Sequence, residues 1–91
     1  LHPRRANSCT QTTQAEPAVE LACRVLRVEL NYGSNRRDLP QARGDLERAL
    51  TLAHASSSVW LPLHIEGDLA VIEADLGQLD AAVERLRRLV Q

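Results

Sequence analysis

The sequence predicts an all-α protein of four helices, arranged as stacked antiparallel helix hairpins. Apolar residues recur at helical spacing in four stretches, separated by segments that contain Gly and Ser. Phe and Met are absent, and there is one Trp and one Tyr. The core must therefore be built from Leu, Val, Ile and Ala, which pack well between helices and less well in a β-sandwich. Helices with two apolar faces also alternate with helices that have only one.

Residues 1–15 contain few apolar side chains and many Ser, Thr, Gln and Asn residues. Such a segment cannot offset the entropy of ordering, so we expect a flexible N-terminal tail followed by a helical repeat domain over residues 16–91. The two cysteines, Cys9 and Cys23, do not amount to a disulfide framework in a helical chain of this length. We expect no bridge between them, with Cys23 packing as a small apolar group.

The first helix is expected to begin at Pro17, where the missing N–H is not needed, and to end at residues 33–35. It has two apolar stripes. One is centred on Val25 and contains Ala18, Leu21, Ala22, Val28 and Tyr32, and the other contains Val19, Cys23, Leu26 and Leu30. The remaining side, which we expect to face water, carries Glu20, Arg24, Arg27 and Asn31.

The second helix is expected to start near Asp38, a favourable N-cap residue, with Pro40 in the first turn. It has a single apolar stripe, and Gly44 falls on its exposed side. Residues 56–58, all Ser, end it. The stripe contains Leu39, Ala42, Leu46, Ala49, Leu50 and Ala53, and Arg43, Glu47, Arg48 and Thr51 are expected to face water.

Residues 58–77 form the third helix, regular from about residue 60 because of Pro62 and closed by Gly77. Two apolar faces require neighbours on both sides, so this helix should be central. One face contains Leu61, Ile65, Leu69, Ile72 and Leu76, and the other Trp60, Leu63, Gly67, Ala70, Val71 and Ala74. The fourth helix, residues 78–90, has one stripe made of Leu79, Ala82, Val83, Leu86, Leu89 and Val90.

The alternation of faces favours a stack of hairpins, in which one helix of each pair is sandwiched while the other lies outside. A closed four-helix bundle would instead require one stripe on every helix. A shift of 40 residues places Leu39, Ala42 and Leu46 on Leu79, Ala82 and Leu86, a period typical of helical-hairpin repeats.

The segment DLGQLDAAVERLRRLV resembles the inter-helix turn and second helix of tetratricopeptide (TPR) repeats. There a Gly ends the first helix, with an apolar residue and a small Ala following at +2 and +5, here Gly77, Leu79 and Ala82. In its pattern of apolar and small residues, the sequence resembles the longer TPR-like repeats of LuxR/MalT-type bacterial transcriptional regulators. That resemblance implies about two repeats and a sensor or scaffolding role. The first repeat departs from the pattern, because the position equivalent to Gly77 is occupied by Arg37.

The bulk properties narrow the function classes. A net charge of −1 gives no electrostatic reason to expect nucleic acid or an anionic membrane as a partner. The chain lacks an apolar run that could cross a bilayer, and its N-terminus lacks the apolar region of a signal peptide, so we expect a cytoplasmic protein. Neither a phosphate-binding glycine loop nor a nucleophile with a base partner is present. We therefore expect no enzyme activity and no cofactor.

Charged seams separate the apolar faces of the third helix. His64, Asp68 and Asp75 share one edge, which suits a solvated or groove-lining role better than a metal site. Glu66 and Glu73 share the other edge, which we expect to be solvated. Trp60 could act as a hairpin staple or as an anchor for a partner, because Trp is enriched at binding hot spots.

The sequence thus predicts a non-catalytic interaction module that binds a protein or peptide partner. Its groove should be lined by the polar edges of the first and third helices. The partner-binding candidates are Arg24, Arg27, Trp60, His64, Asp68 and Asp75. The alternative is a structural segment of a longer solenoid, such as the sensor region of a bacterial regulator, that has no ligand of its own and self-associates, for example as a homodimer through exposed helix faces.

Overall fold

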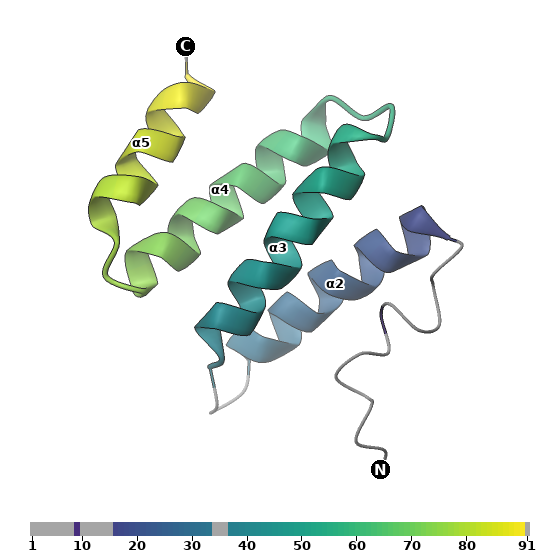
Figure 1. Ribbon diagram of the computed structural model, residues 1–91, viewed down its shortest axis with the longest axis horizontal. Coiled ribbons are helices and arrows are strands. Elements are labelled where there is room, and N and C mark those ends of the chain that lie inside the picture. Colours follow the sequence, from purple (N-terminus) through teal and green to yellow (C-terminus); the bar gives the residue numbers. More distant parts are fainter. Residues whose placement is uncertain (1–8, 10–15, 34–36, 91) are drawn as a thin grey trace.

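The computed structural model describes Cys9, residues 16–33 and residues 37–90, and these contain four helices (Figure 1). They are α2 (Pro17–Tyr32), α3 (Leu39–His54), α4 (Trp60–Asp75) and α5 (Leu79–Leu89). The predicted all-α fold is confirmed, and the four helices begin and end close to the predicted residues. Apart from Cys9, the expected flexible tail lies outside the described residues.

The helix ends follow from local chemistry. The side chain of Asp38 accepts a hydrogen bond from the Gln41 backbone N–H at 3.1 Å, which caps α3 as predicted. Gly77 follows α4 with φ of +84°, a left-handed conformation that glycine adopts without strain. There the backbone N–H of Gln78 reaches the carbonyl of Glu73 at 2.8 Å, so the chain turns sharply into α5.

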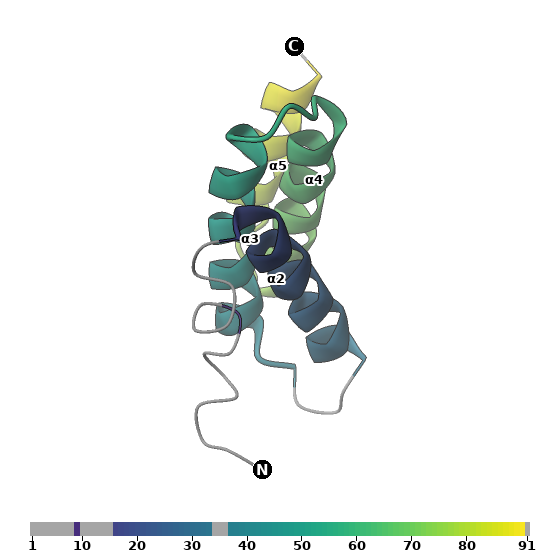
Figure 2. The same cartoon turned by 90° about the vertical axis from the view of Figure 1, so that its right-hand side faces the viewer.

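Each helix packs on its neighbours in the chain: α2 on α3, α3 on α4, and α4 on α5. Among the described helices no other pair has its backbones close together, and the molecule is flat, measuring 42 × 34 × 15 Å along its principal axes. Figure 2 shows this slab turned by 90°. The arrangement is an open stack of hairpins rather than a closed bundle, because α2 and α5 do not meet.

The core lies along α3 and the adjacent face of α4. Four α3 side chains are fully buried, and three from α4 meet them with at most 1% exposure. Together these residues are Ala42, Leu46, Ala49, Ala53, Ile65, Leu69 and Ile72. As predicted, α4 has neighbours on both sides, α3 and α5. Val28 of α2 completes the buried cluster.

The prediction that the first helix is sandwiched between neighbours while the second lies outside is wrong. None of the other described helices covers the second apolar stripe of α2, since Val19, Leu26 and Leu30 are 45%, 57% and 65% exposed. It is α3, with a single apolar stripe, that lies between two helices. Apolar periodicity did not reveal this because the side of α3 that faces α2 carries a buried carboxylate, Asp45, which is 2% exposed.

Candidate functional site

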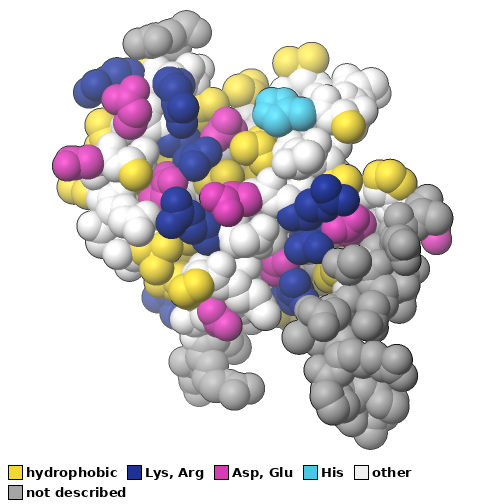
Figure 3. All heavy atoms as spheres, in the orientation of Figure 1, with side chains coloured by type: hydrophobic (Ala, Val, Ile, Leu, Met, Phe, Trp, Pro, Cys, Tyr) yellow, Lys and Arg dark blue, Asp and Glu magenta, His cyan; other side chains and the backbone are white. Residues whose placement is uncertain are grey.

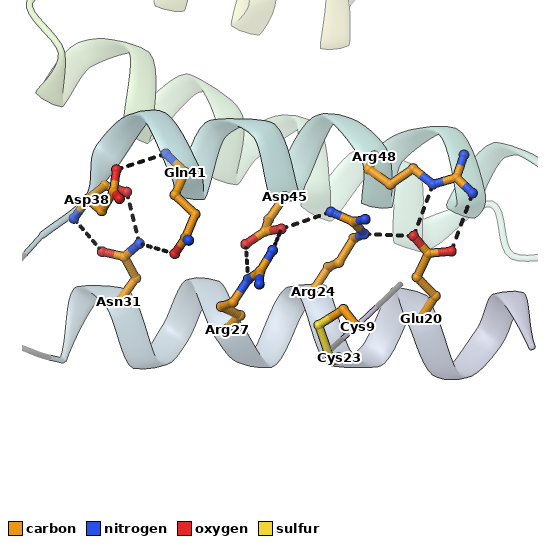
Figure 4. A network of polar contacts seen from close by, with 10 residues as sticks. All are labelled: Cys9, Glu20, Cys23, Arg24, Arg27, Asn31, Asp38, Gln41, Asp45 and Arg48. Atoms are coloured by element: carbon orange, nitrogen blue, oxygen red, sulfur yellow. Dashed lines mark hydrogen bonds and ion pairs between the residues drawn. A yellow bond between two sulfur atoms is a disulfide. The ribbon is translucent and has the colours of Figure 1, made fainter. Parts of the chain in front are cut away.

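A polar seam fills the interface between α2 and α3 (Figure 4). At its centre, Asp45 accepts hydrogen bonds from Arg27 Nε and Nη2, both at 2.7 Å, and from Arg24 Nη1 at 2.9 Å. The planar guanidinium of Arg27 thus binds the carboxylate with two parallel bonds, the strongest geometry for such a pair. The carboxylate is nearly inaccessible to water, so its charge is balanced within the protein.

Two further clusters extend the seam. At one end the carboxylate of Glu20, 5% exposed, accepts bonds from Arg24 Nε at 2.8 Å and Arg48 Nε at 3.1 Å. These bonds, chiefly the one from Arg48, lower the pKa of Glu20 below its usual range. At the other end, the Asn31 side chain donates to the Asp38 carbonyl at 2.8 Å and accepts from the Asp38 N–H at 2.7 Å.

The prediction that this side of α2 faces water is therefore wrong. Glu20, Arg24, Arg27 and Asn31 recur at the spacing of a core stripe, and they do occupy an inter-helix position. They are tolerated there because α3 supplies oppositely charged and hydrogen-bonding partners to each of them. Arg48, also expected to face water, contributes to the same seam. Gly44 is exposed, as predicted.

The second hairpin is held by a similar pair with the charges exchanged. Arg85 of α5 donates Nε and Nη2 to the two oxygens of Glu73 on α4, at 2.9 and 3.0 Å, and its Nη1 binds Glu66. Glu73 is 2% exposed, so the expected solvated edge is wrong at this position. Chiefly because of Arg85, the pKa of Glu73 is lowered.

A disulfide joins Cys9 to Cys23 on α2, with Cα atoms 5.6 Å apart. Our expectation that these cysteines do not pair is wrong. Cys9 is 2% exposed and thus belongs to the folded structure, although it lies within the segment expected to be a tail. Composition does not reveal such a bridge because a single cysteine in a polar segment carries no periodic signal.

A groove of about 300 Å³ lies between α2 and α4, with α3 beneath it. It exists because both helices pack on α3 while their backbones stay apart, although Tyr32 of α2 bonds to Asp75 at the end of α4. Its floor is apolar and its rim is polar. The floor contains the buried Val28, Leu46 and Ile72, and the rim contains Glu29, Tyr32, His64 and Asp68, with the 56% exposed Val71 beside them.

The six predicted partner-binding residues fall into separate places. His64 and Asp68 line the groove, with His64 Nε2 3.6 Å from Asp68 Oδ2. Arg24 and Arg27 lie in the α2–α3 seam instead. Trp60 is 71% exposed at the start of α4, so it does not pack as a hairpin staple.

Asp75, the sixth, lies at the end of α4 and ties it to α2. Its carboxylate accepts bonds from the Tyr32 hydroxyl at 2.9 Å and from Arg37 Nη2 at 3.0 Å, while the Arg37 guanidinium stacks 4.7 Å from the centre of the Tyr32 ring. Burial, and then the bond to Asp75, raises the pKa of Tyr32. His64, Asp68 and Asp75 do not converge, and in the part of the chain that is described no three His, Cys, Asp or Glu side chains are arranged to hold a metal ion.

Sequence reasoning missed Tyr32 and Glu29 as groove residues. Tyr32 was placed in an apolar stripe, and Glu29 carried no signal of its own. Tyr32 lies four residues after Val28, and Glu29 lies three residues before Tyr32. This helical spacing could have indicated that they share one edge. Only the placement of α4 across α3 shows that this edge borders an opening.

The surface charge shows no field of a single sign on the face seen in Figure 3, where acidic and basic side chains alternate across the helices. None of the described helices has the length and apolarity required to cross a bilayer. Comparisons with models of protein families, with curated proteins and with solved structures found no match to this chain.

Proposed function

We propose that this protein is a non-catalytic interaction module that binds a peptide segment of a protein partner in the α2–α4 groove. The observation that supports the proposal is the groove itself, an apolar floor inside a rim of polar side chains between two helices held apart by a third. A volume of about 300 Å³ has room for an apolar anchor side chain. Concave sites of this kind usually combine an apolar floor with a few orienting polar groups.

The rim favours a basic peptide. Asp68 is paired only with His64 among the described residues, and Glu29 has no ion pair there. Neither carboxylate is neutralised by an arginine, in contrast to Asp45 and Glu73. A segment that places an apolar side chain on the floor and Arg or Lys beside it would complement both features.

Selection from a displayed random-peptide library, with the oxidised 91-residue chain as bait, tests this function. We expect enriched peptides with one apolar anchor flanked by basic residues. Their binding should fall about tenfold or more in Glu29→Arg and Asp68→Arg, because each change removes an attraction and adds a repulsion. Glu84→Arg, the same charge change on exposed α5, is the matched control and should bind normally.

Chemical-shift mapping then locates the bound peptide. Perturbations should gather at Val28, Tyr32, His64 and Val71. A selection that enriches no peptide, or perturbations confined to α5, would contradict the proposal.

The second candidate is a structural segment that self-associates and has no peptide ligand. It is supported by the uncovered apolar stripes, on α2 and on α5. That such a segment forms the sensor region of a bacterial TPR-type regulator rests on the sequence resemblance alone. A cytoplasmic location stays a prediction, and the Cys9–Cys23 disulfide would be unusual in a reducing compartment.

A further inference from the structure

The apolar stripe of α5 is largely uncovered. Leu79, Val83, Leu86 and Val90 follow the spacing i, i+4, i+7, i+11 and are 63%, 43%, 47% and 84% exposed. Only Ala82 of this helix is buried, at 3%. Four large apolar side chains in one line on an 11-residue helix and its C-cap form the pattern of a helix–helix seam that lacks its second helix.

The stripe continues onto α4 as a shallow hollow of about 200 Å³. Its α4 side is built of small residues, Gly67, Ala70 and Ala74, together with Val71. Small side chains on this side leave room for a further helix to approach, while the α5 side supplies the large apolar ones. A helix that entered the hollow would contact α4 and α5 together and cover the stripe.

The charges beside the stripe identify the missing helix. Asp80 and Arg87 are seven positions apart, so they lie on one flank of the stripe, about 90° around the helix. The opposite flank faces α4, where Ala82 is buried and Arg85 binds Glu73. A complementary partner must place a cation beside Asp80 and an anion beside Arg87, in line with an apolar stripe of the same length.

A second α5 meets this requirement when it runs antiparallel. We propose that the protein forms a two-fold symmetric dimer in which α5 packs against α5 of a second copy. With the pair centred between Glu84 and Arg85, Leu79 lies opposite the partner's Val90, and Val83 opposite the partner's Leu86. All four large apolar side chains are then covered in both copies.

The same register brings the charges together. In an antiparallel helix pair, flanking residues of the same heptad position face each other, so Asp80 meets the partner's Arg87 and Arg87 meets the partner's Asp80. A parallel pair would place Asp80 against Asp80 and Arg87 against Arg87. Among the described residues Arg87 pairs with Glu84 alone, at 3.5 Å, and this exposed pair competes weakly.

This dimer goes beyond the peptide-binding function. Apart from Val71, the hollow and the α2–α4 groove have no lining residue in common. Substitutions on α5 therefore leave the groove lining unchanged, and loss of dimerisation and loss of peptide binding can be measured separately.

Sedimentation equilibrium of the oxidised chain over a range of concentrations tests the proposal. We expect a monomer–dimer equilibrium. Asp80→Arg and Arg87→Asp should each weaken the dimer about tenfold, because both symmetric pairs become repulsive. Arg88→Asp changes the charge equally, one residue further along the exposed surface, and should alter the dimer constant less than about twofold.

The double variant Asp80→Arg/Arg87→Asp decides the case, because exchanging the charges restores attraction across the two-fold axis. Its dimer constant should return to within about threefold of the original. Circular dichroism should show lower helix stability, since the exchange opposes the helix dipole. Weaker folding with restored dimerisation is a combination that a merely structural role does not give.

Three results would overturn the proposal. One is a chain that stays monomeric through the millimolar range. Another is growth past the dimer with rising concentration, which indicates head-to-tail association through α2. The third is a double variant that dimerises as poorly as the single ones, because the charges would then not face each other.

Discussion

Replacing Asp45 by Asn tests the claim that the α2–α3 seam holds the first hairpin together. The amide keeps the shape of the side chain but removes its charge, and it presents a donor to the arginine groups that now donate three bonds to Asp45. The side chains of Arg24 and Arg27 are only 15% and 24% exposed, so water replaces the lost acceptor incompletely.

Breaking a buried ion pair by removing one partner costs about 3–5 kcal/mol. We expect a loss of about 3 kcal/mol, at the low end of that range, because Arg24 retains its bond to Glu20. Domains of this size are stabilised by about 5–14 kcal/mol, so such a loss is a large fraction of the total. Urea unfolding followed by far-ultraviolet circular dichroism measures it directly.

Asp75→Asn is the matched control. Asp75 also accepts bonds from two side chains, those of Tyr32 and Arg37, but its own side chain is 38% exposed. Its loss should cost less than about 1 kcal/mol, the usual range for an exposed pair. Equal losses for the two variants, or a loss below about 1 kcal/mol for Asp45→Asn, would refute the view that burial gives the seam its importance.

Three further outcomes are expected. Arg85 lowers the pKa of Glu73 from its usual 4.5. The stability that ionised Glu73 contributes is therefore complete above that pH and is lost as the pH falls through the folded-state pKa. Urea unfolding between neutral and acidic pH should show this fall, and Glu73→Gln should flatten it. Gly77→Ala, at φ of +84°, should lower the unfolding free energy by about 1 kcal/mol. Gly44→Ala, in an exposed helix position with open space around it, should raise the unfolding free energy by up to about 1 kcal/mol. Changes of the same sign in both variants would contradict this expectation. Reduction of the Cys9–Cys23 bridge, which spans 14 positions, should lower the unfolding free energy by up to about 3 kcal/mol. The helical circular dichroism signal should be retained at low temperature. An unchanged urea midpoint would show that the bridge contributes nothing to stability.

The candidate site was only partly predictable from the sequence. His64 and Asp68 were identified because they share one edge of a helix, and that edge does border the groove. Arg24 and Arg27 share an edge in the same way, yet they bind Asp45 in the interior. A polar stripe at helical spacing is the same in both cases, and the sequence does not say whether the opposing helix offers a counter-charge or an opening.

Local chemistry written in the sequence determined the four helices, their caps and the reversal at Gly77, because propensity, capping and φ preference act within a few residues. It also determined that α4 needs a neighbour on each side. Only the tertiary structure decided that α3, not α2, lies between two helices, that a carboxylate and two arginines fill an inter-helix seam, and that the α5 stripe is open. The physical reason is that burial belongs to pairs of surfaces: whether Glu20 or Leu30 faces water depends on what the next helix places opposite it.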